Sequence, residues 1–330
     1  MQIKRRNTNR YRIYEMASYF FDVIKQCARK IVNMCEEFIN FIYRFFKNLF
    51  VSNKLSFIDR VIRAVVFVEV ESELTRHLYC EYERRRISEL NCDYLFLQPR
   101  ETTENTKHIV LFKSHGTSIY SFVQGFRLDF LANCFNITWY VIDYKKECYD
   151  MNIKVENRLS THCLDHFVAC VDALISRINM EGNKPSLVGF SLGCAMLLEY
   201  ASRTGKRFFF SKIILFSPFL SLREYLHRNR LLLWFVGKRI NKNFSFNNRA
   251  NITKIPENPE QNGEPREFSD KRDDILILHG KQDNVIPIRH AEELARVGRC
   301  RLVTIPWCKH VDVVNDSRTW KKTMEFLNKN

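Results

Sequence analysis

The sequence predicts an α/β fold in which a mostly parallel β-sheet is flanked by helices. Four short runs are apolar without alternation: residues 109–112, 187–190, 213–216 and 275–278. Such runs are typical of strands that are covered on both faces, as in a parallel sheet. Stretches with helical spacing lie between them, which is the alternation expected of this fold class.

Seven strands and three helices follow from this pattern. The predicted strands are Tyr94–Gln98, His108–Lys113, Ile137–Asp143, Ser186–Phe190, Lys212–Phe216, Asp274–His279 and Arg301–Ile305. The predicted helices cover about Leu164–Ile178, Leu192–Ser202 and Trp320–Leu327. We expect them to form one domain over residues 66–330.

Residues 1–65 differ from the rest of the chain in their pattern of apolar and basic side chains, and we call them the N-terminal lead. Apolar side chains recur there at three- and four-residue spacing, while basic side chains interrupt every long apolar run. A basic amphipathic helix results, which suits the plane of an anionic membrane surface better than a membrane crossing. Packing of this helix on the following domain is the alternative. Cys27 and Cys35 lie in the lead, where either acylation or simple burial would explain them.

The composition narrows the class of partner and the compartment. The net charge is +15, which indicates an anionic surface such as lipid headgroups or nucleic acid. The sequence contains no helix-turn-helix, zinc-finger or RNA-recognition signature, so we expect no nucleic acid. The 11 cysteines form no C-x-x-C pair, and no secretory signal is visible. These features predict a reducing, cytoplasmic location, with peripheral association on membranes left open.

The strand–helix pattern breaks over residues 221–273. An apolar segment, Leu231–Val236, is followed there by a polar stretch with Pro256, Pro259, Gly263 and Pro265. Long loops within compact domains often cover active sites. We therefore expect a cap or loop insertion over the site at about 221–273.

Gly189–Gly193 fits the nucleophile-elbow pattern G-x-S-x-G, with Ser191 at its centre. Only 10 glycines occur in 330 residues, so two at this spacing around a serine are rarely a coincidence. The motif follows a predicted strand and opens a predicted helix, which is the setting that an elbow requires. Ser191 is therefore the candidate nucleophile, and an ordinary loop serine is the alternative.

A serine hydroxyl needs a base, and the base needs an acid to orient it. Asp283 and His310 each follow a predicted strand downstream of Ser191, in the order serine, acid, histidine. His227, His279 and His290 also follow the serine, but none lies between a final strand and a final helix. We predict Asp283 as the acid and His310 as the base, with turn capping and a surface histidine as alternatives.

Two backbone N–H groups are candidates for an oxyanion hole. The Leu192 N–H stands at the start of the helix after Ser191, where the helix dipole favours negative charge. The loop after the strand near residues 108–113 contains Gly116, and the Thr117 N–H is the predicted second donor.

These segments together resemble the α/β-hydrolase superfamily over about residues 66–330. Within it the chain looks most like the depalmitoylase-like and monoglyceride-lipase-like acyl hydrolases. The matching segments are Ser114–Gly116, Ile142–Tyr144, Gly189–Gly193, Phe216–Pro218, His279–Gly280 with Asp283, and His310. The resemblance implies hydrolysis of an ester or thioester through an acyl-enzyme, with no metal and no cofactor. Lys145–Cys148 and Cys194 depart from the family pattern, the first of them at the border of the expected pocket.

The sequence thus predicts a serine hydrolase for a lipid or acylated-protein substrate. A catalytically silent binding protein and a serine peptidase are the alternatives, since a fold by itself does not define an activity. The sequence leaves open the acyl chain, the headgroup, the choice among ester, thioester and peptide, and the oligomeric state.

Overall fold

The computed structural model describes residues 69–70, 82–90, 92–114, 116–117, 119–142, 159–206, 209–226, 246–257 and 272–329. The chain divides into two compact units, Met1–Val70 and Glu71–Asn330. Of the first unit, only strand β1 (Glu69–Val70) is described. The predicted lead of residues 1–65, its boundary with residue 66, and Cys27 and Cys35 lie outside the described residues.

The second unit contains a large β-sheet. Its strands are β2 (Glu83–Ile87), β3 (Cys92–Leu97), β4 (Lys107–Phe112), β6 (Ile137–Ile142), β7 (Ser186–Phe190), β8 (Ile213–Phe216), β9 (Arg272–Gly280) and β10 (Cys300–Ile305). The short strand β5 (Gly116–Thr117) follows β4 in the chain, and a 3-10 turn (Ser88–Leu90) separates β2 from β3.

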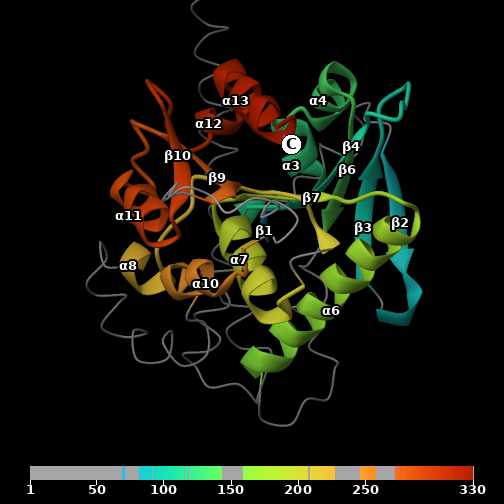
Figure 1. Cartoon of the computed structure of the whole chain (residues 1–330), viewed down its shortest axis with the longest axis horizontal. Coiled ribbons are helices and arrows are strands. Elements are labelled where there is room, and N and C mark those ends of the chain that lie inside the picture. Colours follow the sequence, from blue (N-terminus) through green and yellow to red (C-terminus); the bar gives the residue numbers. More distant parts are fainter. Residues whose placement is uncertain are drawn as a thin grey trace, which may run out of the picture. The chain divides into compact units, whose positions relative to one another are not determined.

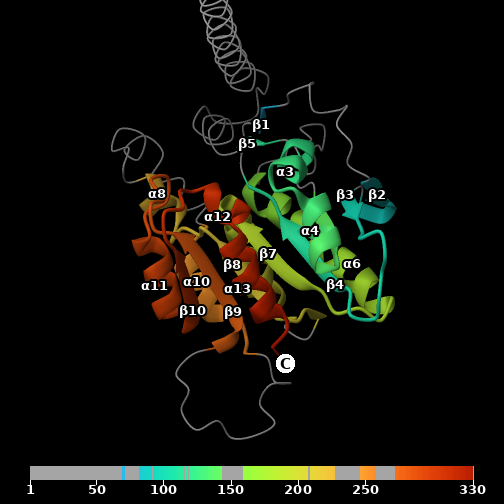
Figure 2. The same ribbon diagram turned by 90° about the horizontal axis from the view of Figure 1, so that it is seen from above.

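The sheet has 8 strands in the order β10-β9-β8-β7-β4-β6-β3-β2. All neighbours from β10 to β6 pair in parallel, whereas β3 runs antiparallel to both β6 and β2. Figure 2 shows this succession from β10 at one side to β2 at the other. Every residue of β3, β6, β7 and β8 is buried, which agrees with the apolar runs in the sequence.

Helices cover both faces of the sheet (Figure 1). One layer holds α6 (Leu159–Met180), α7 (Leu192–Thr204), α10 (Asn248–Lys254) and α11 (Arg289–Val297). The other holds α3 (Ile119–Gly125), α4 (Leu128–Phe135), α12 (Asp312–Asn315) and α13 (Ser317–Leu327). Between this second layer and the sheet lies a continuous core that includes Trp139, Phe216 and Trp320.

This layered sheet with its single reversed strand is the α/β-hydrolase fold, and it confirms the fold class predicted from the sequence. The predicted strands and helices agree with the observed ones to within a few residues at each end. The pattern of the sequence did not reveal β2, α3, α4 or α12. The segment 83–87 reads Glu-Arg-Arg-Arg-Ile, and so charged a run becomes a strand only because it pairs with β3 at the sheet edge.

Part of the predicted insertion at 221–273 is described. It contains α8 (Leu222–Leu226) and α10, and β9 begins at Arg272. Helix α10 packs against α7 and α11, and the Asn251 amide donates to Glu199 of α7 at 2.7 Å. The apolar segment Leu231–Val236 lies outside the described residues, so its place over the site stays a prediction.

Candidate active site

Ser191 occupies the sharp turn between β7 and α7. Its φ of 56° and ψ of −115° are values that residues with a side chain rarely adopt. The Ser191 N–H donates to the Phe216 carbonyl of β8 at 2.9 Å, which ties the turn to the neighbouring strand. Strained backbone of this kind persists where the surrounding structure enforces it, and it is common at active sites.

The two glycines of the motif are required by close backbone approach. A Cβ atom at Gly193 would lie 1.9 Å from the Phe112 carbonyl oxygen at the end of β4. A Cβ at Gly189 would lie 2.8 Å from the backbone nitrogen of Cys194. Any side chain at either position would therefore push α7 away from the sheet.

Ser191, His310 and Asp283 form a continuous hydrogen-bonded chain. The Ser191 Oγ lies 3.1 Å from His310 Nε2, and His310 Nδ1 lies 2.7 Å from Asp283 Oδ2. The three residues follow β7, β10 and β9, whose carboxyl ends lie along one edge of the parallel sheet. A carboxylate can only accept, so Nδ1 carries the proton and Nε2 is left to accept from the serine hydroxyl.

The Asp283 carboxylate is held from several sides. Its Oδ1 accepts from the N–H groups of Val285 at 2.9 Å and Ile286 at 2.7 Å. Burial alone would raise the pKa of Asp283, but the His310 and Ile286 hydrogen bonds and the nearby imidazoles outweigh it, so the pKa lies below its ordinary value. The group therefore stays ionised and can stabilise a positive charge on His310.

The loop that carries His310 is fastened to the end of β9. The Gln282 N–H donates to the Cys308 carbonyl at 3.0 Å, and a Cβ atom at Gly280 would meet that same oxygen at 2.3 Å. The Phe190 ring lies against the His310 imidazole, with ring centroids 5.1 Å apart. Backbone and aromatic contacts together fix the orientation of the histidine.

His279 touches the acid as well, a contact that the sequence reasoning missed. Its Nε2 donates to the Ile286 carbonyl at 2.8 Å and lies 3.4 Å from Asp283 Oδ2. Burial lowers the pKa of His279, which keeps this fully buried imidazole neutral. Its position at the end of β9, four residues before Asp283, is the signal that could have revealed it.

Another histidine considered from the sequence has a structural partner. His290 Nδ1 accepts from the Leu220 N–H at 3.3 Å. His227 lies outside the described residues.

The two predicted oxyanion donors occupy different kinds of position. Leu192 is the first residue of α7, so its N–H has no acceptor within the helix. Thr117 lies in β5, beyond the end of β4, and Phe112 at that end pairs with Gly189 beside the elbow. The chain thus leaves β4 next to Ser191, while the Thr117 N–H as second donor stays a prediction.

The departure at Cys194 has a local explanation. The Cys194 thiol is fully buried behind the elbow and donates to the carbonyls of Gly189 at 3.1 Å and Phe216 at 3.2 Å. Burial raises the pKa of this thiol well above its ordinary value. It therefore acts as a small packing group with a weak donor.

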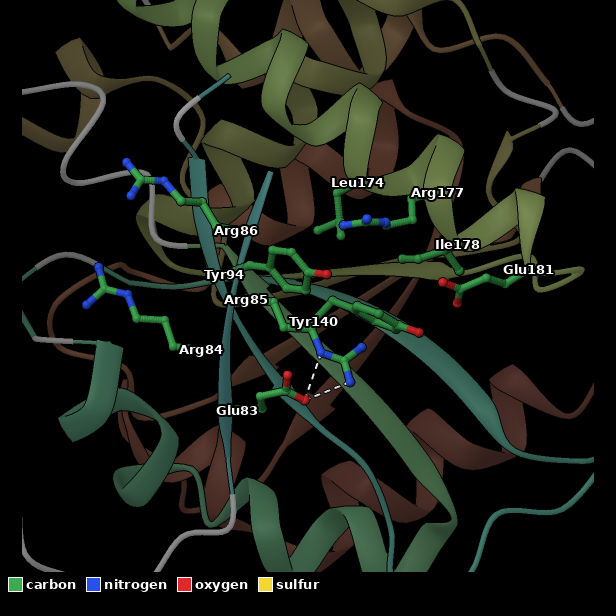
Figure 3. Close-up of a pocket in the computed structure, with 10 residues that line it drawn as sticks. All are labelled: Glu83, Arg84, Arg85, Arg86, Tyr94, Tyr140, Leu174, Arg177, Ile178 and Glu181. Atoms are coloured by element: carbon green, nitrogen blue, oxygen red, sulfur yellow. Dashed lines mark hydrogen bonds and ion pairs between the residues drawn. The ribbon is translucent and has the colours of Figure 1, made fainter. Parts of the chain in front are cut away.

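A cavity of about 390 Å³ lies elsewhere, between α6 and the β2 edge of the sheet (Figure 3). The Arg85 guanidinium there donates to Glu83 at 2.7 and 2.9 Å, whereas Arg84 and Arg86 point the other way and pair with Asp93. Four arginines and two glutamates line the cavity, so the lining is basic on balance, although two of the arginines pair with Asp93. Within the described ranges, no group of three or more His, Cys, Asp or Glu side chains could hold a metal ion. In the same ranges, no helix has the length and hydropathy that crossing a membrane requires.

No family model matches the sequence. The Escherichia coli (strain K12) protein "Uncharacterized protein YfhR" is 26% identical over 156 residues, which are 46% of this chain and 47% of that protein. The match thus spans about half the length of this relative.

Several solved structures resemble the chain at low identity. A "predicted CIB-like hydrolase" from Thermoplasma acidophilum is 17% identical with a TM-score of 0.45, covering 74% of this chain and 97% of that one. An acylaminoacyl peptidase from Pyrococcus horikoshii is 14% identical with a TM-score of 0.49, covering 75% and 41%. A puromycin-hydrolysing peptidase from Mycobacterium tuberculosis is 11% identical with a TM-score of 0.47, covering 74% and 38%. Fold and geometry define an α/β-hydrolase-fold protein with a serine–histidine–aspartate chain at the elbow.

Proposed function

We propose that the chain is a serine hydrolase that cleaves an acyl ester or thioester through an acyl-enzyme. One observation carries this proposal: the hydrogen-bonded chain from Ser191 through His310 to Asp283, mounted on a strained elbow. A serine in this setting has both a base to take its proton and a buried carboxylate to stabilise the charged base.

The first half of the reaction acylates the serine. Ser191 Oγ attacks the substrate carbonyl carbon while its proton passes to His310 Nε2. Negative charge develops on the carbonyl oxygen, where the Leu192 N–H and the start of α7 would stabilise it, with the Thr117 N–H as second donor. His310 then returns the proton to the leaving oxygen or sulfur, so that an alcohol or a thiol departs.

The second half releases the acid. Water attacks the acyl carbon, and His310 Nε2 accepts one of its protons. The ester bond to Ser191 then breaks, and the proton passes from His310 to the serine oxygen. A carboxylic acid is released, and the starting hydrogen-bonded chain is restored.

The substrate class rests on the sequence. The apolar, aromatic insertion at 221–273 and the amphipathic lead of residues 1–65 both favour a substrate with a hydrophobic acyl group. The depalmitoylase-like and monoglyceride-lipase-like acyl hydrolases act on substrates of this kind. In this proposal the lead holds the protein on an anionic membrane surface, where a lipid or an acylated protein is the substrate.

Labelling with a fluorophosphonate probe tests the proposal. Wild type should be labelled, and Ser191→Ala should lose labelling and turnover by more than about a thousandfold, because no other group replaces the nucleophile. Ser217→Ala is the matched control, since Ser217 is also a buried serine at positive φ just after a strand. It should be labelled like wild type.

Two results would contradict the proposal. Labelling of Ser191→Ala at the wild-type rate would place the nucleophile elsewhere. A folded wild type that is not labelled would favour a silent binding protein on this fold. For a labelled protein, parallel turnover of ester, thioester and peptide substrates separates an acyl hydrolase from a peptidase.

A further inference from the structure

Three large apolar side chains stand exposed on the two loops that carry Asp283 and His310. Trp307 is 77% exposed, Val311 54% and Val285 40%. Trp307 and Val311 flank His310 between β10 and α12, and Val285 follows Asp283 by two residues. We call these three residues the apolar rim.

The two loops are direct neighbours. The Lys281 N–H donates to the Ile305 carbonyl at 2.9 Å, and the Gln282 N–H donates to the Cys308 carbonyl at 3.0 Å. The Asp283–His310 hydrogen bond joins them a third time. The apolar rim therefore borders the active site, although its members are distant in sequence.

Trp307 is exposed because the fold holds it there. Its φ of 66° is a left-handed conformation that is costly for a bulky residue. The residues on both sides are anchored, since Ile305 and Cys308 are buried and the Arg318 guanidinium donates to the Pro306 carbonyl at 3.0 Å. An indole that an anchored loop keeps exposed to solvent is available for contact with an apolar environment.

Basic side chains lie close to the rim in the chain. Lys281 and Lys309 are exposed on the two loops, and Arg289 is exposed at the start of α11. Of the nearby carboxylates, Asp312 accepts from the Lys309 N–H, and Asp316 is paired with Arg318. A surface that combines an exposed aromatic side chain, aliphatic neighbours and nearby basic groups has the composition that favours binding to an anionic lipid interface.

We infer that the apolar rim docks on an anionic lipid surface and brings the active site against it. The inference deepens the proposed acyl hydrolase, on which its link to turnover rests. It is independent of the N-terminal lead, because it stands on a different part of the chain. A lipid surface would cover Trp307 and the valines while the flanking ammonium and guanidinium groups meet the headgroups.

Tryptophan fluorescence of the full-length protein tests the docking. Trp139 and Trp320 are buried, and replacing Trp234 with phenylalanine leaves Trp307 as the main reporter. The probe is phosphatidylcholine vesicles with about 30% phosphatidylserine, to supply negative surface potential. We expect the emission to move to shorter wavelength on binding, and brominated acyl chains to quench it.

Variants of the rim give the second readout. Trp307→Ser and Val311→Ser should each weaken vesicle binding, by about tenfold for the tryptophan, because one buried aromatic side chain is lost. Phe130→Ser on α4 and Met180→Ser at the end of α6 are matched controls, since these side chains are 48% and 82% exposed away from the rim. The controls should bind like wild type, and thermal unfolding of each variant checks its folding.

Four outcomes would overturn the docking. They are the absence of vesicle binding, binding without quenching of Trp307, equal weakening by rim and control variants, and a Trp307 shift on self-association without vesicles. Fluorophosphonate labelling of the same preparations separates this inference from the proposed function. If the protein is labelled but fails these tests, only the docking inference is contradicted. If the protein docks but is not labelled, only the proposed hydrolase function is contradicted.

Discussion

At the scale of single residues, close backbone contacts determine which side chains the site tolerates. Ser191 adopts a left-handed φ, and the glycines on either side let α7 start almost in contact with the end of β4. Cys194 fills the space behind the turn with a buried thiol. The elbow is therefore constrained by its neighbours as much as by its own sequence.

Gly193→Ala should disrupt the elbow. The new methyl carbon would lie 1.9 Å from the Phe112 oxygen, so α7 or β4 must move. We expect a loss of about 2–4 kcal/mol in the free energy of unfolding and loss of fluorophosphonate labelling. Gly125→Ala is the control, because a Cβ there meets nothing within 4 Å. Wild-type stability and labelling of Gly193→Ala would contradict the close contact.

Cys194 should resist thiol reagents in the native protein. Burial raises its pKa, and the thiolate is the form that reacts. Iodoacetamide followed by mass spectrometry should modify the exposed Cys134 first and Cys194 only after unfolding. Modification of both at equal rates would show that the elbow opens in solution.

At the scale of secondary-structure elements, long-range contacts determine features that the local sequence leaves undefined. The charged segment of β2 becomes a strand through β3, and α10 is placed by α7 and α11. Lys212 joins the start of β8 to the end of α13, where its ammonium donates to the carbonyls of Phe326, at 2.7 Å, and Lys329.

Lys212→Met should loosen the C-terminal helix. Two carbonyls lose a buried donor, which we expect to cost about 1–2 kcal/mol in the free energy of unfolding near neutral pH. Burial, with the nearby cations Lys107 and Lys329, lowers the pKa of Lys212 to about 8. In the unfolded chain Lys212 keeps its proton up to about pH 10. As the pH rises from about 8 to about 10, the free energy of unfolding of wild type should therefore increase relative to that of Lys212→Met.

Urea unfolding at several pH values measures this difference. Lys322→Met is the control, because Lys322 is a partly exposed lysine of α13 whose only described ion pair is with Glu325. It should change stability by less than about 0.5 kcal/mol. A Lys212→Met protein as stable as wild type at every pH would show that the buried ammonium contributes nothing.

At the scale of the whole molecule, charge should set the response to acid. The Arg318 hydrogen bond holds the pKa of Asp316 far below its usual range, and the pKa of Asp283 is lowered as well. A carboxylate with a lowered pKa in the folded state stabilises the fold above its unfolded pKa of about 4, and this contribution is lost as pH falls further. The net charge of +15 grows at the same time and adds repulsion.

We therefore expect the free energy of unfolding to fall steeply below about pH 4. Urea titrations at neutral pH and at successively lower pH measure it. Asp316→Asn should be less stable than wild type at neutral pH and should lose less on acidification. A urea midpoint that stays unchanged down to about pH 3 would contradict the lowered pKa of Asp316 and that of Asp283.

The sequence by itself determined the parallel sheet, the elbow at Ser191 and the choice of Asp283 and His310. Each depends on local information: an apolar run, a glycine pair, or the position of a residue after a strand. Only the tertiary structure decided the contact of His279 with the acid, the fit of Gly280 against the His310 loop, and the exposure of Trp307 beside the site. These depend on distances between segments far apart in the chain, which packing sets and no local pattern records.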